Sequence, residues 1–482
     1  MQTARSLDTY RLLGRSGLRV SPLSLGTVTF GTDWKGTGVE EVDARRIFDV
    51  FVERGGNFFD TANRYQGGQA EAMLGKFAQG RRERLILSTK YGQTVGKDDP
   101  NEGGNHRRSM VRSVEASLKR LDTDYIDLLY LHCWDSTTQV DEILRGMDDL
   151  VKSGKVVYVG ISNTPAWQVS RMQTMADLRG WSPLVALQVE YSLIERTVER
   201  ELLPMAREMG LGVIPWSPTG SGVLSGKYGR ADLEPPTSAA TDTSKRRIAA
   251  LVKLNERSLA IIDVVKAVAN EIERSPSQVA LAWTLLNPAV ISPAMGVRSE
   301  AQLEDSLGAL TIDFSDDQRR RLDAVSAIEL GFPHRFLASP MVRDSITGGA
   351  KIIGRAAAED RARATVSPVA AKRPDAVAVA NRARGGCDGV WDLVIKMPVA
   401  NLKSVMTVQT NGKEFTGTHD GDLGSGDLCG TIDGSKLCWT MNATVPMSMT
   451  LDCSATVDAD TLTGSVVAGA LGSFPLSGQR RK

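Results

Sequence analysis

The chain has 482 residues, 41% of them hydrophobic, and its 58 Lys and Arg residues nearly balance its 57 Asp and Glu residues. This length exceeds that of a typical single domain, so we expect one large domain and something smaller. The net charge of +1 excludes the basic surface typical of nucleic-acid-binding proteins. The sequence has no stretch of about 18 apolar residues, so we expect no transmembrane helix.

The N-terminus and the cysteines indicate the compartment. The first residues lack the apolar core of a secretory signal. Of the five cysteines, only Cys133 precedes residue 387, a distribution typical of a reducing compartment. We therefore expect a cytoplasmic protein.

Short apolar runs alternate with longer amphipathic runs along the first two thirds of the chain. Residues Tyr10–Ser21 predict a small hairpin around Arg15-Ser16-Gly17. The strand-like runs that follow are Leu23–Gly26, Asn57–Phe59, Leu85–Thr89, Ile126–Leu131, Val156–Ile161, Val185–Val189, Gly212–Pro215 and Val290–Ser292. The helix-like runs are Val42–Arg54, Gln69–Phe77, Arg107–Leu121, Val140–Ser153, Ala166–Asp177, Val198–Met209, Ser258–Glu273, Pro276–Leu286 and Glu300–Ala309.

This alternation predicts an α/β fold with a closed parallel (β/α)8 barrel, the TIM barrel. A doubly wound open sheet is the alternative. The barrel is favoured because no Gly-x-Gly-x-x-Gly fingerprint follows the first strand. Polar residues also recur just past the strand ends, where barrels place their active sites. The long segment Pro218–Asn255, rich in Gly, Ser, Thr and Pro, is typical of a functional loop.

The composition divides the chain into a barrel domain (1–355), a flexible linker (356–386) and a small all-β module (387–482). The linker is rich in Ala, Arg, Pro and Val and has no clear periodicity. The module alternates apolar and polar residues around the turn pairs Asn411-Gly412, Asp420-Gly421 and Asp433-Gly434. We expect an antiparallel barrel or sandwich of six to eight strands.

A two-residue turn at Asp433-Gly434 predicts that Ile432 pairs with Ser435, and hence Cys429 with Cys438. The apolar face would then carry Leu428, Ile432, Leu437 and Trp439, and the two cysteines would share the opposite face. Their Cα atoms would lie about 4.5 Å apart, within disulfide range. Two reduced thiols are the alternative, which a cytoplasmic location favours.

Four chemically capable side chains lie at or just after three neighbouring strand ends. Asp60 ends one run, Tyr65 follows in the next turn, Lys90 ends the second run, and His132 ends the third. A buried carboxylate needs a cationic partner, which Lys90 supplies. Taken singly, each residue has an ordinary structural explanation; together they predict one site.

Residues from about 10 to 355 resemble an aldo-keto reductase. The resemblance lies in residues 60–65 (DTANRY), 87–90 (LSTK), 125–132 (YIDLLYLH), 160–163 (GISN), 216–218 (WSP), 222–228 (GVLSGKY), 296–298 (GVR) and 302–305 (QLED). It implies a (β/α)8 barrel that reduces carbonyl groups with NADPH. Tyr65 would donate the proton, Lys90 would lower the pKa of the phenol, Asp60 would hold Lys90 charged, and neutral His132 would orient the substrate.

The resemblance also implies the cofactor contacts. Ser162, Asn163 and Gln188 would hold the nicotinamide, with Tyr191 as a stacking aromatic. The pyrophosphate would lie against Trp216, Ser217, Gly222, Leu224 and Lys227, and the adenosine end would face Gly296, Arg298, Gln302 and Asp305. Arg298 favours NADPH over NADH because a guanidinium suits a 2′-phosphate. No metal is expected.

The expected substrate is a small carbonyl compound or alcohol. Phe30, Trp34, Tyr91 and Trp134 follow strand ends and would line an aromatic pocket. The alternative function is a cofactor-binding regulatory or adaptor protein on the same barrel, because potassium channel β subunits resemble this family. The all-β module could take a protein or glycan partner; neither a nucleic acid nor a membrane is expected.

Overall fold

The computed structural model describes residues 5–96, 98–233, 250, 252–350, 386–396, 401–443, 449–468 and 472–481. Its contacts divide the chain into two compact units, Met1–Glu329 and Leu330–Lys482. This division falls before the predicted barrel limit at residue 355, and the predicted linker lies outside the described residues except for Gly386. Within the described residues, no helix combines the length and apolar character that crossing a bilayer requires.

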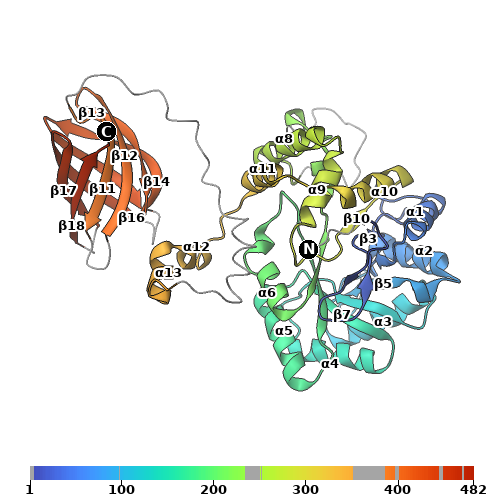
Figure 1. The fold of residues 1–482 in the computed structure, drawn as a ribbon. Coiled ribbons are helices and arrows are strands. Elements are labelled where there is room, and N and C mark those ends of the chain that lie inside the picture. Colours follow the sequence, from blue (N-terminus) through green and yellow to red (C-terminus); the bar gives the residue numbers. More distant parts are fainter. Residues whose placement is uncertain are drawn as a thin grey trace. The chain divides into compact units, whose positions relative to one another are not determined.

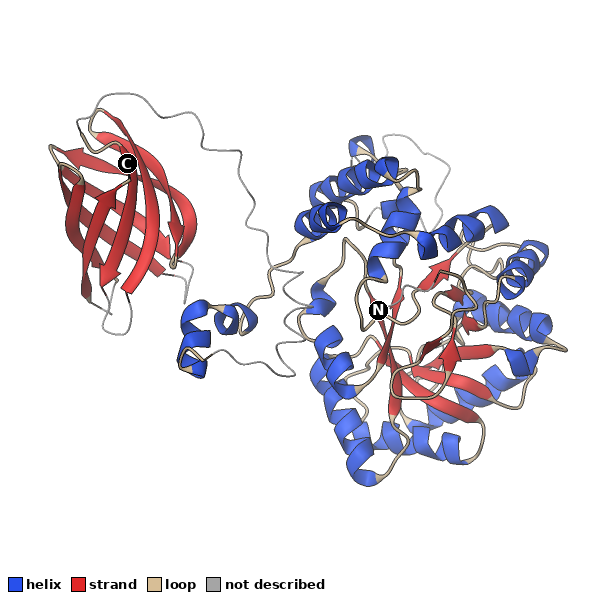
Figure 2. Ribbon diagram, in the orientation of Figure 1, coloured by secondary structure: helices blue, strands red, loops and turns tan. Residues whose placement is uncertain are grey.

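The first unit is an eight-stranded parallel sheet surrounded by helices (Figures 1 and 2). Its strands pair in the order β10-β3-β4-β5-β6-β7-β8-β9. They are β3 (Ser24–Gly26), β4 (Phe58–Asp60), β5 (Ile86–Tyr91), β6 (Ile126–Leu131), β7 (Val156–Ser162), β8 (Leu184–Glu190), β9 (Gly212–Trp216) and β10 (Ala294–Gly296). This confirms the predicted (β/α)8 class over the open sheet.

The eighth strand differs from its prediction. The predicted run Val290–Ser292 contributes only a parallel bridge between Val290 and Val213 of β9. The strand itself is β10, which pairs with β3 from Ala294↔Ser24 to Gly296↔Gly26. Residues 290–296 are mostly apolar with no clear alternation, so the sequence alone does not mark which three residues pair. The bridge links the residues just before β10 to β9, which stands at the other end of the strand order, and so connects the two ends of the sheet.

The helices of the first unit follow the predicted alternation. They are α1 (Glu41–Glu53), α2 (Gln69–Ala78), α3 (Arg107–Leu121), α4 (Val140–Lys152), α5 (Ala166–Arg179), α6 (Leu202–Met209), α8 (Glu256–Glu271), α9 (Pro276–Thr284), α10 (Glu300–Leu307) and α11 (Asp316–Ser326). Helix α11 was not predicted, although Ser315 and Gln318 form a capping box at its start. Short 3₁₀ segments are η1 (Tyr65–Gly68), η2 (Arg82–Arg84), η3 (Thr197–Glu199), η4 (Gly220–Ser225), η5 (Arg230–Asp232) and η6 (Gly308–Thr311).

Two apolar layers hold this unit together. The inner layer fills the barrel and includes Phe58, Leu128, Tyr130 and Ile214. The predicted hairpin, β1 (Arg11–Leu12) with β2 (Arg19–Val20), is confirmed. Leu13 and Val20 of this hairpin belong to the inner layer. The outer layer packs the opposite strand faces against the helices.

The second unit contains α12 (His334–Ala338), α13 (Pro340–Thr347) and a closed barrel of eight antiparallel strands. Neither helix was predicted. The strands are β11 (Gly389–Lys396), β12 (Asn401–Asn411), β13 (Glu414–Gly421), β14 (Gly424–Asp433), β15 (Lys436–Ala443), β16 (Met449–Asp458), β17 (Thr461–Val467) and β18 (Ser473–Arg480). The expected all-β module is therefore a barrel, filled by residues such as Trp391, Phe415 and Leu437.

The predicted hairpin register between β14 and β15 is wrong by two residues. Asp433 pairs with Lys436, so the turn is Gly434-Ser435, and Cys438 lies opposite Thr431 rather than Cys429. A shift of two residues keeps every side chain on its predicted face. The apolar face is accordingly as predicted, while Cys429 is exposed and all five cysteines are free thiols.

Candidate functional site

Strand alternation brings the predicted catalytic residues together at one end of the first barrel. Successive side chains of a strand point to opposite faces. Because Phe58 and Leu128 point inward, Asp60 on β4 and His132 after β6 also face the interior. Lys90 on β5 joins them through its ion pair with Asp60. The parallel strands all end at the same edge, so these groups meet there.

Asp60 and Lys90 form a buried ion pair. Lys90 Nζ lies 2.7 Å from Asp60 Oδ2 and donates a further hydrogen bond to the Thr61 carbonyl at 2.7 Å. The other oxygen of Asp60 accepts from Ser88 Oγ at 3.0 Å and from Gln188 Nε2 at 2.9 Å. Burial alone would lower the pKa of Lys90, but Asp60 and Tyr65 outweigh it and the pKa is raised. Lys90 is therefore a fixed cation.

Tyr65 is held against this cation. Lys90 Nζ donates to the Tyr65 hydroxyl at 3.2 Å and lies 4.8 Å from the ring centroid. The expected effect of Lys90, which lowers the pKa of the phenol, is present but is not the largest one. Burial raises the pKa of Tyr65 and outweighs the opposing effect of Lys90. The phenol thus keeps its proton at neutral pH, as a proton donor must, while Lys90 favours the phenolate left behind.

His132 completes the group as a neutral imidazole. Its ring stands edge-on to Tyr65, with centroids 5.9 Å apart. Burial, reinforced by the charges of Lys90 and Arg64, lowers the pKa of His132 to about 3. A neutral imidazole carries one N–H donor and one acceptor nitrogen. It can therefore donate a hydrogen bond to a ligand oxygen without adding a second positive charge beside Lys90.

Several buried polar atoms around this group have no hydrogen-bond partner within the described residues. They include Thr61 Oγ1, Asn63 Oδ1, Tyr130 OH and His132 Nδ1. All four belong to the carboxyl-terminal ends of β4 and β6 or the residues just after them. Buried polar groups are normally satisfied. A polar ligand or water bound at this end of the barrel would supply the missing partners.

The residues predicted for the nicotinamide are linked by hydrogen bonds to Asp60 and to the backbone of His132. Gln188 is bonded to Asp60 as described above. Asn163, in the left-handed conformation with φ 45°, donates from Nδ2 to the His132 carbonyl at 2.9 Å and to Ser162 Oγ at 3.0 Å. Its Oδ1 accepts from Trp216 Nε1 at 3.0 Å. The half-buried indole of Trp216 therefore lies beside Asn163.

The residues predicted for the pyrophosphate follow β9 in a tight turn. Ser217 Oγ accepts from the Ser221 amide at 2.7 Å, and Ser217, Gly220, Ser221 and Gly222 all have positive φ. A Cβ added at Gly222 would lie 3.7 Å from Lys227 Nζ. The bare glycine thus leaves space beside an ammonium group, which suits an anion. Leu224 is buried beneath this turn.

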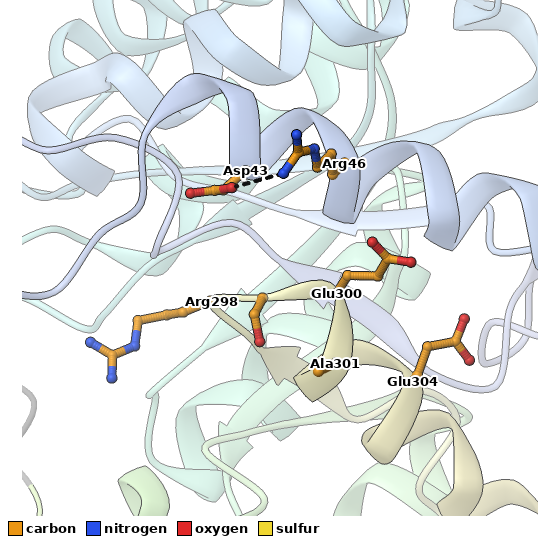
Figure 3. A pocket seen from close by; sticks show the side chains of 7 residues that line it. Asp43, Arg46, Arg298, Glu300, Ala301 and Glu304 are labelled. Atoms are coloured by element: carbon orange, nitrogen blue, oxygen red, sulfur yellow. Dashed lines mark ion pairs between the residues drawn. The ribbon is translucent and has the colours of Figure 1, made fainter.

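The residues predicted for the adenosine end do not all border the same space. A pocket of about 510 Å³ lies between α1 and α10 and is lined by Arg298, Ser299, Glu300 and other residues (Figure 3). Gln302 Oε1 accepts from the Arg298 amide at 2.9 Å, and Gly296 is exposed with open space above it. Asp305 instead bonds Ser275 Oγ at 2.9 Å and Gln278 Nε2 at 3.2 Å, which joins α10 to the start of α9.

Three of the predicted aromatic residues are buried in the structure. Phe30 and Tyr91 are fully buried, with Phe30 packed 6.2 Å from Phe77, and both lie in the layer between sheet and helices. Tyr91 follows inward-facing Lys90 by one residue and so points to the opposite face. Tyr191 is likewise buried, 5.2 Å from Trp283, with its hydroxyl on Glu199.

Two predicted aromatic residues do lie near the site. Trp34 and Trp134 are half-buried. Trp34 stands edge-on to Tyr65 with centroids 6.4 Å apart, and the Trp134 amide donates to the Asn163 carbonyl at 3.3 Å. The sequence analysis overlooked Ser88, which bonds Asp60 from the strand position two before Lys90. The period of two would have placed it on the same face.

Comparison with known proteins identifies the family. The model of the aldo/keto reductase family matches residues 22–327. Norsolorinic acid reductase of Aspergillus flavus is 36% identical over 343 residues, which cover 69% of this chain and 84% of that protein. The uncharacterized oxidoreductase YrpG of Bacillus subtilis is 40% identical, covering 66% of this chain and 95% of its own length. Aryl-alcohol dehydrogenase GME11368 of Pestalotiopsis microspora is 35% identical, covering 69% and 85%.

The family match stops well before the second unit's barrel. It spans the eight parallel strands and the residues that meet at their ends. The family model matches more than half of the chain, and relatives above 30% identity are matched over most of their own length. The chain therefore belongs to the aldo/keto reductase family and is an oxidoreductase.

Proposed function

We propose that this protein reduces an aldehyde or ketone to an alcohol, reversibly, with NADPH as the cofactor. The observation that carries the proposal is the chain of contacts from Asp60 through Lys90 to the Tyr65 hydroxyl, 2.7 and 3.2 Å long. A bound nicotinamide supplies a hydride, which side chains cannot. The protein's own residues must then supply a proton and stabilise charge on the carbonyl oxygen.

Tyr65 is the proposed proton donor. As negative charge develops on the substrate oxygen, the phenol releases its proton to that oxygen, and the Lys90 ammonium stabilises the phenolate that remains. Asp60 keeps Lys90 charged and fixed in a site from which water is largely excluded. His132, neutral at physiological pH, donates its N–H to the same oxygen and orients the carbonyl group. In the oxidative direction the same groups act in reverse.

The proposed cofactor preference rests on Arg298. Its half-buried side chain borders the pocket between α1 and α10 (Figure 3). A guanidinium fork matches the oxygens of a 2′-phosphate. The turn from Ser217 to Gly222, with Lys227 beside it, fits a pyrophosphate. The names of two relatives, an aryl-alcohol dehydrogenase and a reductase of norsolorinic acid, support an organic carbonyl or alcohol as substrate.

The test follows NADPH consumption by the full-length protein with a panel of aldehydes and ketones. Tyr65→Phe should abolish turnover but leave NADPH affinity nearly unchanged, because the substitution removes only the hydroxyl. Full activity in this variant would refute the assignment of Tyr65. Cofactor binding without turnover of any carbonyl by the wild type would favour a regulatory role instead.

The second unit's barrel is proposed to be an appendage that does not contribute to turnover. Deletion of residues 360–482 should leave kcat and KM unchanged, because the hydrogen bonds described for the proposed site all come from residues before 330. A large loss of activity in a folded deletion variant would show that the barrel takes part in the reaction.

A further inference from the structure

The segment between β3 and α1 forms a narrow loop. The Val39 amide donates to the Thr29 carbonyl at 2.8 Å, and the Gly31 amide donates to the Val39 carbonyl at 3.1 Å. Phe30 and Val39 form a parallel bridge. We call residues 28–39 the Trp34 loop. These contacts hold the two ends of the loop together, and Trp34 lies between those ends in the sequence.

A single side chain joins the Trp34 loop to the turn that carries Tyr65. Gln66 is fully buried, and both ends of its amide are used. Its Oε1 accepts from the Trp34 amide at 2.7 Å, and its Nε2 donates to the Val28 carbonyl at 2.9 Å. A Cβ added at Gly31 would lie 2.8 Å from the Gln66 Cβ, so the loop passes directly over this side chain.

The backbone of Gln66 is in an unfavourable conformation. Its φ of 49° and ψ of 43° lie in the left-handed region, where residues other than Gly, Asn and Asp are uncommon. Gly67 and Gly68 follow with φ of 61° and 96°. Such strain persists only where the surroundings hold it. Here the hydrogen bonds to Val28 and Trp34 supply that hold, so the choice of Gln is tied to the loop.

We propose that Gln66 is a positioning residue that fixes Trp34 beside the proton donor and thereby selects planar aryl aldehydes and ketones. The indole lies 6.4 Å from the Tyr65 ring at 74°. An aromatic ring beside a reacting carbonyl would meet this indole, and such pairs are favourable beyond simple burial. The inference rests on the proposed carbonyl reduction and adds its substrate class.

A second glutamine supports the same arrangement from the next turn. Gln69 Oε1 accepts from the Thr32 amide at 2.9 Å. Gln69 is the first residue of α2, so the Trp34 loop is tied at two points to the segment that begins with Tyr65. Movement of the loop relative to the phenol would break both ties.

The test measures kcat/KM of full-length protein for 2-naphthaldehyde and for propanal. In Gln66→Gly the ratio of these two values should fall about tenfold, the scale of one aromatic pair. The melting temperature should fall only moderately, because glycine tolerates the positive φ but leaves the Val28 carbonyl and the Trp34 amide without their partner. Gln66→Asn, which suits the left-handed region but has a shorter side chain, should show the same fall. If the glycine variant does not fold, the asparagine variant decides.

Two comparisons separate positioning from a merely structural role. Trp34→Ala should lower the same ratio, and adding Gln66→Gly to it should lower the ratio no further, because the two residues act through one contact. Asp122→Gly is the matched control. Asp122 has the same φ of 49° at the exposed end of α3, so its replacement should leave the ratio unchanged.

Unchanged selectivity in a folded Gln66 variant, or losses that add in the double variant, would overturn the inference. Failure of the wild type to reduce any carbonyl compound would instead refute the proposed function. The two failures are therefore distinguishable in the same assay.

Discussion

Replacing Asp60 with asparagine tests the ion pair on which the proposed site depends. Lys90 is 0% exposed and Asp60 only 3% exposed, so the pair is shielded from solvent. Asparagine is nearly the same size, and its oxygen can still accept from Ser88 and Gln188. Its amide group, however, cannot neutralise the Lys90 ammonium. Asp60→Asn therefore leaves a buried cation without its counter-ion.

The cost of this change follows from the burial. Removing one partner of a buried ion pair typically costs about 3–5 kcal/mol. We expect a loss of unfolding free energy in that range at pH 7. We also expect kcat to fall by at least about 100-fold, because Lys90 would no longer be held charged beside Tyr65.

The pH dependence gives the sharper test. In the wild type the pKa of Lys90 is raised, so its stabilising contribution is complete at neutral pH and is lost only as the pH rises through that raised pKa. Without Asp60, burial, the largest influence on Lys90, lowers its pKa below the unfolded value. Stability of the variant then increases as pH rises toward the unfolded pKa of about 10.4. The difference between the two proteins should shrink from pH 7 to pH 10.

The assay is urea unfolding followed by circular dichroism of the helices, most of which belong to the first unit. The double variant Asp60→Asn/Lys90→Met is the control, because it removes the buried charge. It should recover part of the lost stability and lose the variant's pH dependence. A stability difference that does not change between pH 7 and pH 10 would refute the role assigned to the pair.

Three further outcomes are expected. The pKa of His132 is about 3 when folded and about 6.5 when unfolded, so its contribution to stability is present above pH 6.5 and is lost as the pH falls. Between pH 7 and pH 4, urea unfolding should show a loss of unfolding free energy that is about 3 kcal/mol smaller in His132→Gln than in the wild type. Equal losses would contradict this. Gly160→Ala places a Cβ 2.6 Å from the Tyr130 ring and should cost about 1–3 kcal/mol in urea unfolding, whereas Gly17→Ala, with nothing within 4 Å, should not. Arg298→Ala should raise KM for NADPH but not for NADH; equal effects on both would remove the 2′-phosphate assignment.

The barrel was predictable, and so was the meeting of Asp60, Tyr65, Lys90 and His132, because both depend on short-range patterns. Parallel strands expose their carboxyl ends at one edge, and the period of two decides which side chains face inward there. Asp60, Lys90 and His132 each satisfy this rule, so counting along each strand was sufficient. The hydrogen bond from Gln188 on β8 to Asp60, by contrast, joins two strands that are not neighbours in the sheet and required the packed barrel.

The errors had different causes. Tyr91 was assigned to the pocket although one residue beyond Lys90 reverses the direction of the side chain. The β14–β15 turn was placed one residue too early because the Asp-Gly signal marks the turn but not which of its residues is central. The loop tie through Gln66 joins residues whose closeness depends on how the two loops pack, which local patterns do not report.

The closure of the second unit's barrel has an evolutionary consequence. Its first and last strands pair with one another, with Trp391 opposite Arg480, so the chain enters and leaves the barrel at neighbouring points. A unit whose ends adjoin can be inserted into or appended to another gene product without stretching either partner. This barrel is therefore suited to attachment to another protein as a self-contained unit.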